Sequence, residues 1–215
     1  MRNRFDRQLQ ELNTDMIQMG NMIEQSIEMA IQALNNRDVQ CAAQAIEFDE
    51  EVNEKEREIE NLCFKLLLQQ QPVARDLRVI SAALKMITDM ERIGDHASDI
   101  SEVTIHLSET GYRNNLDDVE KMAAETTYMV VKSIEAYVEK NEQKAREVIA
   151  QDDVVDELFC KCRADVIKII RENVENGEAA TDLLMIAKYF ERIGDHATNI
   201  AEWVIFSITG VHIKG

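Results

Sequence analysis

The heptapeptide Glu-Arg-Ile-Gly-Asp-His-Ala occurs at Glu91–Ala97 and again, one hundred residues later, at Glu191–Ala197. The flanking residues extend the similarity to Asp89–Glu102 and Tyr189–Glu202. An identity of this length at two places in one short chain is not expected by chance. We therefore interpret the sequence as a tandem duplication in which both halves have kept the same segment.

The composition favours long helices. The chain of 215 residues has only seven Gly and one Pro, and 45% of its residues are hydrophobic. Between a few turn-forming positions, apolar residues recur every three or four residues, as on one face of a helix. We therefore predict an all-α protein, a tandem duplication of an antiparallel three-helix bundle with six long helices. The predicted turns lie at Asn35–Asp38, Gln71–Pro72, Gly111–Asn115, Lys140–Asn141 and Asn176–Gly177.

The two predicted bundles are residues 1–110 and 116–215. An offset of 103 residues aligns the first two helices of each half, so that Ala42, for example, corresponds to Ala145. The offset falls to 100 residues in the third helix. The second half is therefore shorter around its last turn.

The net charge of −17 excludes some partners. Nucleic-acid binding depends on Lys and Arg side chains that neutralise phosphates, so we expect no nucleic-acid partner. The charge also disfavours a direct phosphate or anionic-lipid site, unless a metal or a local basic patch reverses it. The chain has no hydrophobic signal-peptide region and no apolar run long enough to span a bilayer. We expect a cytoplasmic protein with reduced cysteines that reaches membranes only through its partners.

Acidic residues form stripes on two helices of each half. Glu91, Asp95 and Asp99 are spaced by four residues, which places them on one face of the third helix. Asp49 and Asn53 form a shorter stripe on the second helix, at nearly the same height if the helices are antiparallel. The sequence leaves open whether the two stripes face each other. The second half repeats the pattern with Asp152, Asp156, Glu191, Asp195 and Asn199.

If the stripes do face each other, each half gathers four carboxylates and one amide. Oxygen ligands of this kind suit hard cations such as Mg, Ca, Mn or oxidised iron, and zinc is tolerated. The competing interpretation is an ordinary solvated acidic face, because this chain is acidic throughout. The candidate metal ligands are Asp49, Asn53, Glu91, Asp95, Asp99, Asp152, Asp156, Glu191, Asp195 and Asn199.

Other residues of the repeated motif are expected to have structural roles. His96 and His196 point about 100° away from the carboxylate stripe, so packing or hydrogen bonding is favoured over metal ligation. Gly94 and Gly194 are expected to allow a close approach between helices.

The doubled motif resembles the PhoU family of phosphate-uptake regulators, accessory proteins of the bacterial phosphate-specific transport system. The similarity extends to Gln71–Arg78 and to Ser133–Ala136 and covers the whole chain. It implies two tandem three-helix bundles and no catalysis. It also implies a negative regulator of phosphate uptake and of the phosphate-starvation response.

The resemblance further implies partners and metals. The expected partners are the ATPase subunit of the phosphate ABC transporter, a phosphate-sensing histidine kinase, and a second copy of the chain in a homodimer. Some members of the family carry iron or zinc clusters on Glu/Asp-x-x-x-Asp motifs. Asn53 and Asn199 depart from an all-acid pattern, which leaves the identity and number of ions open. The acidic positions that match the pattern are Glu91, Asp95, Asp99, Glu191 and Asp195, with Asp49, Asp152 and Asp156 opposite.

Several functions compete at this point. The favoured one is a non-catalytic adaptor that holds partner proteins, with Trp203–Phe206 as a candidate contact patch. The alternative is a metal-binding helical carboxylate protein of unrelated function. A di-iron enzyme of the helical-bundle type would use Glu-x-x-His pairs, and none occurs in this chain. A purely structural bundle would have no need of a repeated seven-residue identity.

Overall fold

The computed structural model describes residues 2–70, 73–112 and 117–213, and it is helical almost throughout. No strand occurs in these ranges, so the prediction of an all-α protein with six long helices is confirmed. The helices are α1 (Arg2–Asn36), α2 (Val39–Gln70), α3 (Ala74–Glu109), α4 (Asp117–Glu139), α5 (Glu142–Glu172) and α6 (Gly177–Thr209), with a short 3₁₀ turn η1 (Val174–Asn176) before α6.

The predicted turns coincide with helix ends wherever the structure describes them. Breaks fall within Asn35–Asp38, at Lys140–Asn141, and at the turn η1 that ends beside Gly177. The turn predicted at Gln71–Pro72 lies outside the described residues, as does most of the joint predicted at Gly111–Asn115.

The duplication extends to the geometry of the first turn in each half. Arg37 and Lys140, 103 residues apart, both have positive φ angles, of 54° and 51°. The next residue caps the following helix in both halves. Asp38 Oδ1 accepts hydrogen bonds from the backbone of α2, and the Asn141 side chain accepts one from the backbone N–H of Lys144. These caps satisfy amide groups that have no partner inside the helix, and so they set where the second helix of each half begins.

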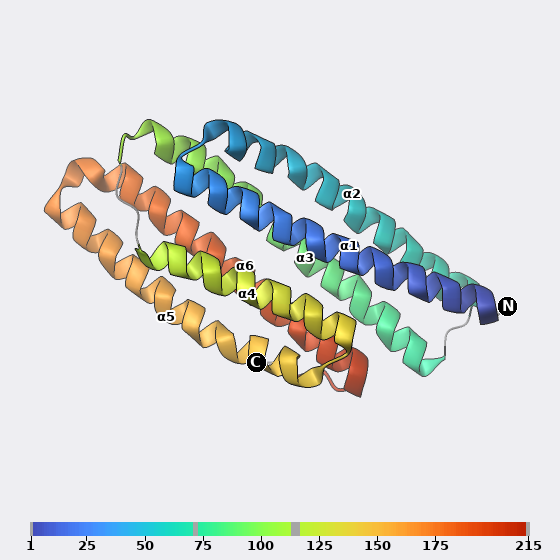
Figure 1. The fold of residues 1–215 in the computed structure, drawn as a ribbon. Coiled ribbons are helices and arrows are strands. Elements are labelled where there is room, and N and C mark those ends of the chain that lie inside the picture. Colours follow the sequence, from blue (N-terminus) through green and yellow to red (C-terminus); the bar gives the residue numbers. More distant parts are fainter. Residues whose placement is uncertain (1, 71–72, 113–116, 214–215) are drawn as a thin grey trace.

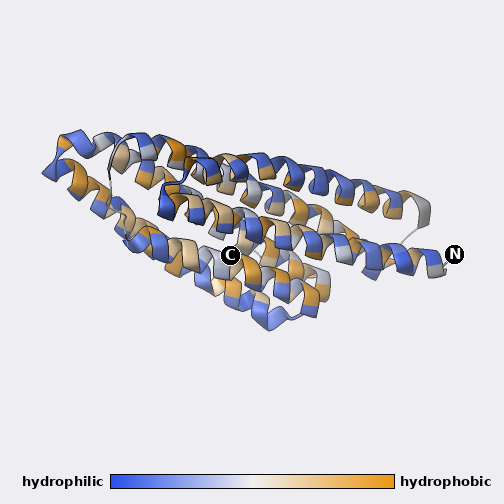
Figure 2. Cartoon of the chain, turned by 45° about the horizontal axis from the view of Figure 1, so that its top comes forward, coloured by the Kyte–Doolittle hydropathy of each residue, from blue (hydrophilic) through white to orange (hydrophobic). Residues whose placement is uncertain are grey.

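The six helices form two antiparallel groups, α1–α3 and α4–α6, that lie side by side (Figure 1). The most extensive contact in the molecule joins α3 to α6, which are the two helices that carry the repeated motif. Hydrophobic residues face inward on all helices (Figure 2) and form one continuous core that runs through both groups. The duplicated halves therefore share a core, and the motif helices lie at its centre.

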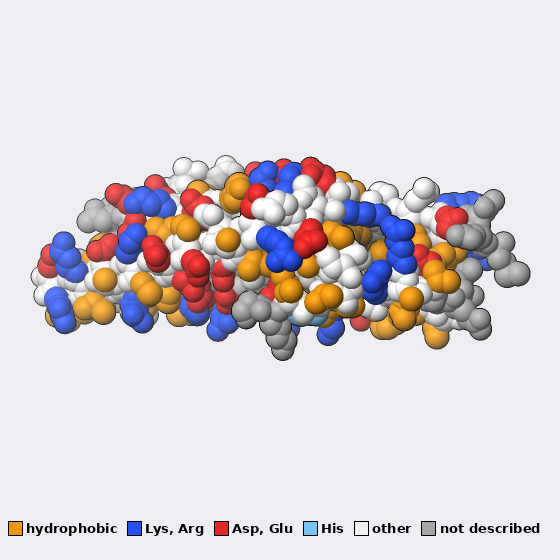
Figure 3. Space-filling model, turned by 90° about the horizontal axis from the view of Figure 1, so that it is seen from below, with side chains coloured by type: hydrophobic (Ala, Val, Ile, Leu, Met, Phe, Trp, Pro, Cys, Tyr) orange, Lys and Arg blue, Asp and Glu red, His pale blue; other side chains and the backbone are white. Residues whose placement is uncertain are grey.

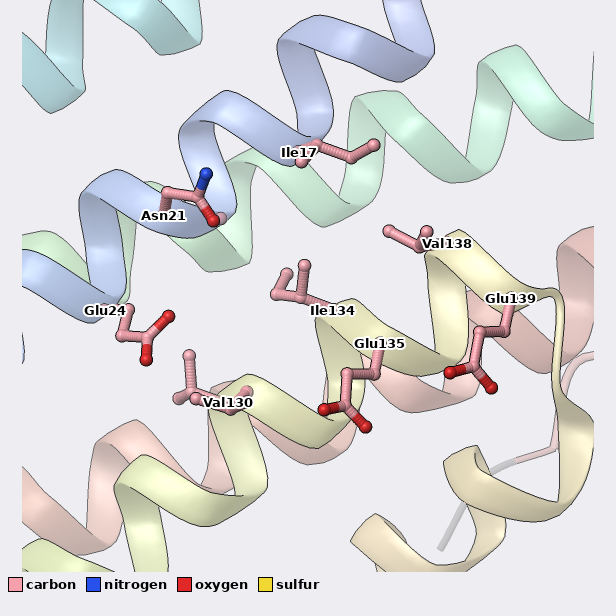
Figure 4. A pocket seen from close by; sticks show the side chains of 10 residues that line it. Ile17, Asn21, Glu24, Val130, Ile134, Glu135, Val138 and Glu139 are labelled. Carbon is pink, nitrogen blue, oxygen red and sulfur yellow. The ribbon is translucent and has the colours of Figure 1, made fainter.

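The two groups also meet at α1 and α4, where a small residue allows close contact. A Cβ atom added at Gly20 would lie 2.8 Å from Ile134 Cγ2, so a larger residue would displace that side chain. Next to this contact is an open groove with a volume of about 210 Å³. Its floor is apolar, and Glu24, Glu135 and Glu139 stand along its rim (Figure 4).

Candidate functional site

The first acidic cluster joins α2 to α3 at the centre of the first half. Gly94 brings the helices close, because a Cβ atom there would lie only 3.1 Å from Asp49 Oδ1 and 3.1 Å from Val52 Cγ1. The two stripes of the first half therefore face each other. The close approach that we predicted for Gly94 is confirmed, whereas the same contact at Gly194 is looser, at 3.5 Å.

The two carboxylate oxygens of Asp49 have different surroundings. Its Oδ2 accepts a hydrogen bond of 3.0 Å from Asn53 Nδ2, while its Oδ1 is buried without a hydrogen-bond partner among the described residues. Burial raises the pKa of Asp49, and the neighbouring charge of Asp95 raises it further. An unsatisfied buried carboxylate oxygen is costly and is a free acceptor for a ligand.

Arg92, on the same helix, partly neutralises two other carboxylates of the first cluster. Arg92 Nη1 donates to Asp95 Oδ2 at 2.7 Å, and Arg92 Nε lies 3.4 Å from Glu91 Oε2. Burial nevertheless raises the pKa of Glu91, and the charge of Asp95 contributes next. Glu56 on α2 contributes to the same shift and was missed by sequence reasoning. Its position seven residues after Asp49, on the same face of α2, was the signal that could have found it.

The second cluster repeats this arrangement between α5 and α6. Burial, followed by the charges of Asp195 and Asp156, raises the pKa of Asp152 from 3.8 to about 6. The pKa of Asp195 is also raised, first by burial and then by Glu191. Asp152 is half-buried and Asp156 is exposed. Figure 3 shows acidic side chains gathered on this face of the molecule, about midway along α5.

The two clusters differ in one respect that the motif does not reveal. In the second half, Lys188 forms an ion pair with Glu191 and lies 5.2 Å from the ring centroid of Phe159. Phe159 occupies the position that corresponds to Glu56 in the first half, and Lys188 corresponds to Thr88. The second cluster thus has one acidic residue fewer and one basic residue more.

The repeated histidines lie between the halves and not within the acidic clusters. Their rings are 5.5 Å apart across the contact of α3 with α6. His96 Nδ1 lies 3.2 Å from Asp99 Oδ2, and His196 Nδ1 lies 2.9 Å from Asp89 Oδ1. Burial lowers the pKa of His96. Both histidines are hydrogen-bonding residues, as predicted, and they link the two halves.

Asn199 belongs to this link as well. Its Nδ2 donates a hydrogen bond of 3.0 Å to Asp89 Oδ1, in the other half of the molecule. The structure therefore directs this amide toward α3, away from the carboxylates of its own half. Asp89 was not singled out from the sequence, because its role depends on a contact between residues 110 positions apart.

Each cluster arranges its carboxylates in a row along two helices. In the part of the chain that the structure describes, no three His, Cys, Asp or Glu side chains converge so that they could hold one ion. The donor chemistry nevertheless fits a hard cation, because oxygen ligands predominate and Asp49 Oδ1 has no partner. Burial, and then repulsion between neighbouring carboxylates, raises the pKa values of Asp49, Glu91, Asp152 and Asp195, and a bound cation would relieve that repulsion.

The fold and the site together define a class of protein: a duplicated all-helical bundle with an acidic cluster at the same place in each half, on either side of a central helix pair. A family model described as the PhoU domain matches twice, at residues 16–104 and 119–204. The chain therefore belongs to the PhoU family, and the resemblance seen in the sequence is confirmed.

Relatives match along nearly the whole length. A "phosphate-specific transport system accessory protein PhoU homolog" from Clostridium acetobutylicum is 36% identical over 97% of this chain and 96% of its own. A homologue from Thermotoga maritima is 34% identical over 98% of this chain and 91% of its own. The crystal structure of PhoU from Pseudomonas aeruginosa superposes with a TM-score of 0.93 at 30% identity, covering 96% of this chain and all of that one.

Proposed function

We propose that this protein is an accessory protein of the phosphate-specific transport system and a negative regulator of phosphate uptake and of the phosphate-starvation response. It acts as a non-catalytic adaptor between the ATPase subunit of the phosphate ABC transporter and a phosphate-sensing histidine kinase, on the cytoplasmic side of the membrane. The observation that carries the proposal is the full-length match to proteins named as accessory proteins of this transport system. The long, exposed helix surfaces offer area for partners.

A deletion strain tests the regulatory role. Loss of the protein should leave a phosphate-starvation reporter switched on in cells that have ample phosphate. Complementation with the wild-type chain should switch it off again. A normal response in the deletion strain, with no second copy of the gene, would refute the regulator proposal. Pull-down of the ATPase subunit and of the kinase tests the adaptor role separately, and a homodimer is tested by light scattering of the purified chain.

We further propose that the acidic clusters bind metal ions, with iron, zinc, Mg, Mn or Ca as candidates. The first site would use Asp49, Asn53, Glu91, Asp95 and Asp99. The second would use the corresponding residues of α5 and α6, with Asn199 required to turn from Asp89. A bound cation would neutralise the carboxylates and so hold the second and third helices of each half together. The free Oδ1 of Asp49 and the raised pKa of its carboxyl group support this proposal.

Elemental analysis by plasma mass spectrometry on untagged protein, purified without chelator, tests the metal sites. Wild type should contain stoichiometric metal, and the double variant Asp95→Asn/Asp195→Asn should contain little. A matched control is Glu50→Gln/Asp153→Asn, which removes two exposed carboxylates beside the clusters. Equal metal content in wild type and in the Asp95→Asn/Asp195→Asn variant would refute the site assignment.

The alternative function, a metal-binding helical carboxylate protein unrelated to phosphate, is favoured by the same unpartnered oxygen at Asp49. The deletion strain and the elemental analysis together distinguish the regulator from this alternative. Stoichiometric metal together with a normal phosphate response in the deletion strain would support the alternative.

A further inference from the structure

One end of this acidic molecule is basic. The start of α1, the end of α2 and the start of α3 lie together there, and this end of the first helical group extends beyond the second group (Figure 1). Residues 4–10 and 61–78 contain two acidic side chains, Asp6 and Asp76, and a net charge of +3. The basic residues in these ranges are Arg4, Arg7, Lys65, Arg75 and Arg78.

The exposed basic residues of this end are available to a ligand. Arg4, Arg7, Lys65 and Arg75 are all exposed. None of the ion pairs found among the described residues involves any of these four side chains. No ion pair among the described residues therefore neutralises these four charges.

Large apolar side chains are exposed at the same end. Leu68 is 84% exposed and Val73 is 67% exposed, and Phe64 and Leu77 are each nearly half exposed. Phe64 and Leu68 are four residues apart and so lie on one face of α2. Leu77 lies in the first turn of α3, and Val73 is the residue that precedes this helix. Figure 2 shows hydrophobic residues reaching the end of α2. We call these four side chains, with Arg4, Arg7, Lys65 and Arg75, the basic end.

The duplication supplies an internal comparison. The corresponding end of the second half also exposes apolar side chains, with Ile167 45% exposed and Val174 78% exposed. Its residues 164–181, which align with 61–78, however contain two basic and four acidic side chains, a net charge of −2, where 61–78 have a net charge of +2. The start of α4 at this end, residues 117–123, adds a further −2. Since both ends derive from one ancestral unit, the basic character is specific to the first half. We call the second one the acidic end.

We propose that the basic end binds directly to a membrane surface that contains anionic lipids. Cationic side chains are attracted to anionic headgroups, while exposed apolar side chains enter the boundary between headgroups and acyl chains. Among the described helices none is apolar enough over a sufficient length to cross a bilayer. This inference goes beyond the regulator proposal and differs from the expectation that membranes are reached only through partners.

The overall charge of the chain does not prevent this contact. Asp49 lies 19 residues before Leu68 on α2, which corresponds to about 28 Å along the helix. Charges separated by more than about 8–10 Å in solvent are largely screened at physiological ionic strength. Glu11 and Glu58 lie closer and line the same cavity as Lys65, so they offset part of the local charge. The membrane would therefore experience the basic end, with a local net charge of at most +3, more strongly than the distant acidic clusters.

Shape favours a membrane over a folded partner. The apolar side chains near this end are exposed, and none of the described cavities is lined by Phe64, Leu68, Val73 or Leu77. Exposed apolar side chains outside any cavity fit a deformable, continuous surface. The competing occupants are an acidic protein surface and the acidic end of a second copy, which would produce open head-to-tail chains.

Vesicle co-sedimentation of the full-length chain tests the proposal. Vesicles of 30% phosphatidylglycerol and 70% phosphatidylcholine should bind the protein at least tenfold more tightly than pure phosphatidylcholine vesicles. The binding should fall steeply between 0.1 and 0.5 M salt. Each basic residue near an anionic surface strengthens binding about fivefold, so Lys65→Glu/Arg75→Glu should weaken it at least 25-fold. Leu68→Ser/Val73→Ser should weaken it while leaving its salt dependence in place.

The matched control is Lys168→Glu/Arg171→Glu, which makes the same charge change on exposed residues of the acidic end. It should bind vesicles as wild type does. The proposal is overturned if wild type ignores phosphatidylglycerol vesicles, if both vesicle types bind equally, or if Lys65→Glu/Arg75→Glu binds unchanged. Equal losses in the test and control variants also overturn it. Absence of vesicle binding with concentration-dependent self-association would assign the basic end to a second copy instead.

Discussion

Replacing Asp152 by Asn should stabilise the protein at neutral pH, although it changes a residue of a candidate site. The Asp152 carboxyl group is half-buried and faces Asp195 and Asp156, so its ionised form is disfavoured in the folded state. Asparagine has nearly the same shape and carries no charge. The substitution therefore removes repulsion with little change in packing.

The size of the effect follows from the pKa of Asp152. A rise from 3.8 to about 6 corresponds to about 3 kcal/mol of destabilisation of the ionised form. Because the side chain is partly exposed, solvent and salt reduce this figure, and we expect a gain of about 1.5 kcal/mol at pH 7.5. For a chain of this length, such a gain raises the melting temperature by about 3–6 °C.

The pH dependence has a definite sign. Between pH 3.8 and about 6 the folded state holds a proton on Asp152 that the unfolded state has lost. The wild-type penalty is therefore full above pH 7, declines as the pH falls through about 6, and vanishes near pH 4. The advantage of Asp152→Asn should decline in the same way.

Thermal unfolding followed by circular dichroism, with EDTA present and at pH 7.5, 6 and 4.5, checks this prediction. Asp153→Asn is the matched control, because Asp153 is adjacent and exposed, and it should change stability by less than about 0.5 kcal/mol. Two results would refute the reasoning: destabilisation by Asp152→Asn at pH 7.5, or a gain that is the same at pH 4.5 as at pH 7.5.

Three further predictions follow from other contacts. Gly20→Ala should destabilise by about 1–2 kcal/mol, since the added Cβ would lie 2.8 Å from Ile134 Cγ2. In thermal melts the loss should be smaller in an Ile134→Ala background, which lacks Cγ2. Lys55→Met should destabilise by about 1–3 kcal/mol in urea titrations, because it removes the buried ammonium group 2.8 Å from Asp15; unchanged stability would show that this pair contributes nothing. The hydrogen bond to Asp182 on α6 raises the pKa of His106. His106→Gln should therefore lower the melting temperature at pH 6 and leave it unchanged at pH 9. Equal effects at both pH values would contradict this prediction.

Part of each acidic cluster could be predicted from the sequence. Helical spacing placed Glu91, Asp95 and Asp99 on one face, and counting from the turn placed Asp49 at their height; the structure agrees on both points. Sequence reasoning did not find Glu56 or the neutralising Lys188, because neither belongs to the repeated motif. Their contributions depend on how far each helix is rotated about its own axis. The assignment of these positions as metal ligands stays a prediction.

The sequence by itself determined the all-helical class, the duplication, the positions of the described turns and the membership of the PhoU family. These properties follow from local effects, namely periodic apolar residues, helix caps and a repeated motif, which neighbouring residues specify. Only the tertiary structure showed that α3 and α6 form the central contact, that Asn199 bonds to Asp89 across the halves, and that one end is basic in an acidic molecule. Such features arise when helices distant in sequence pack together, because the rotation and stagger of each helix are set by the shared core.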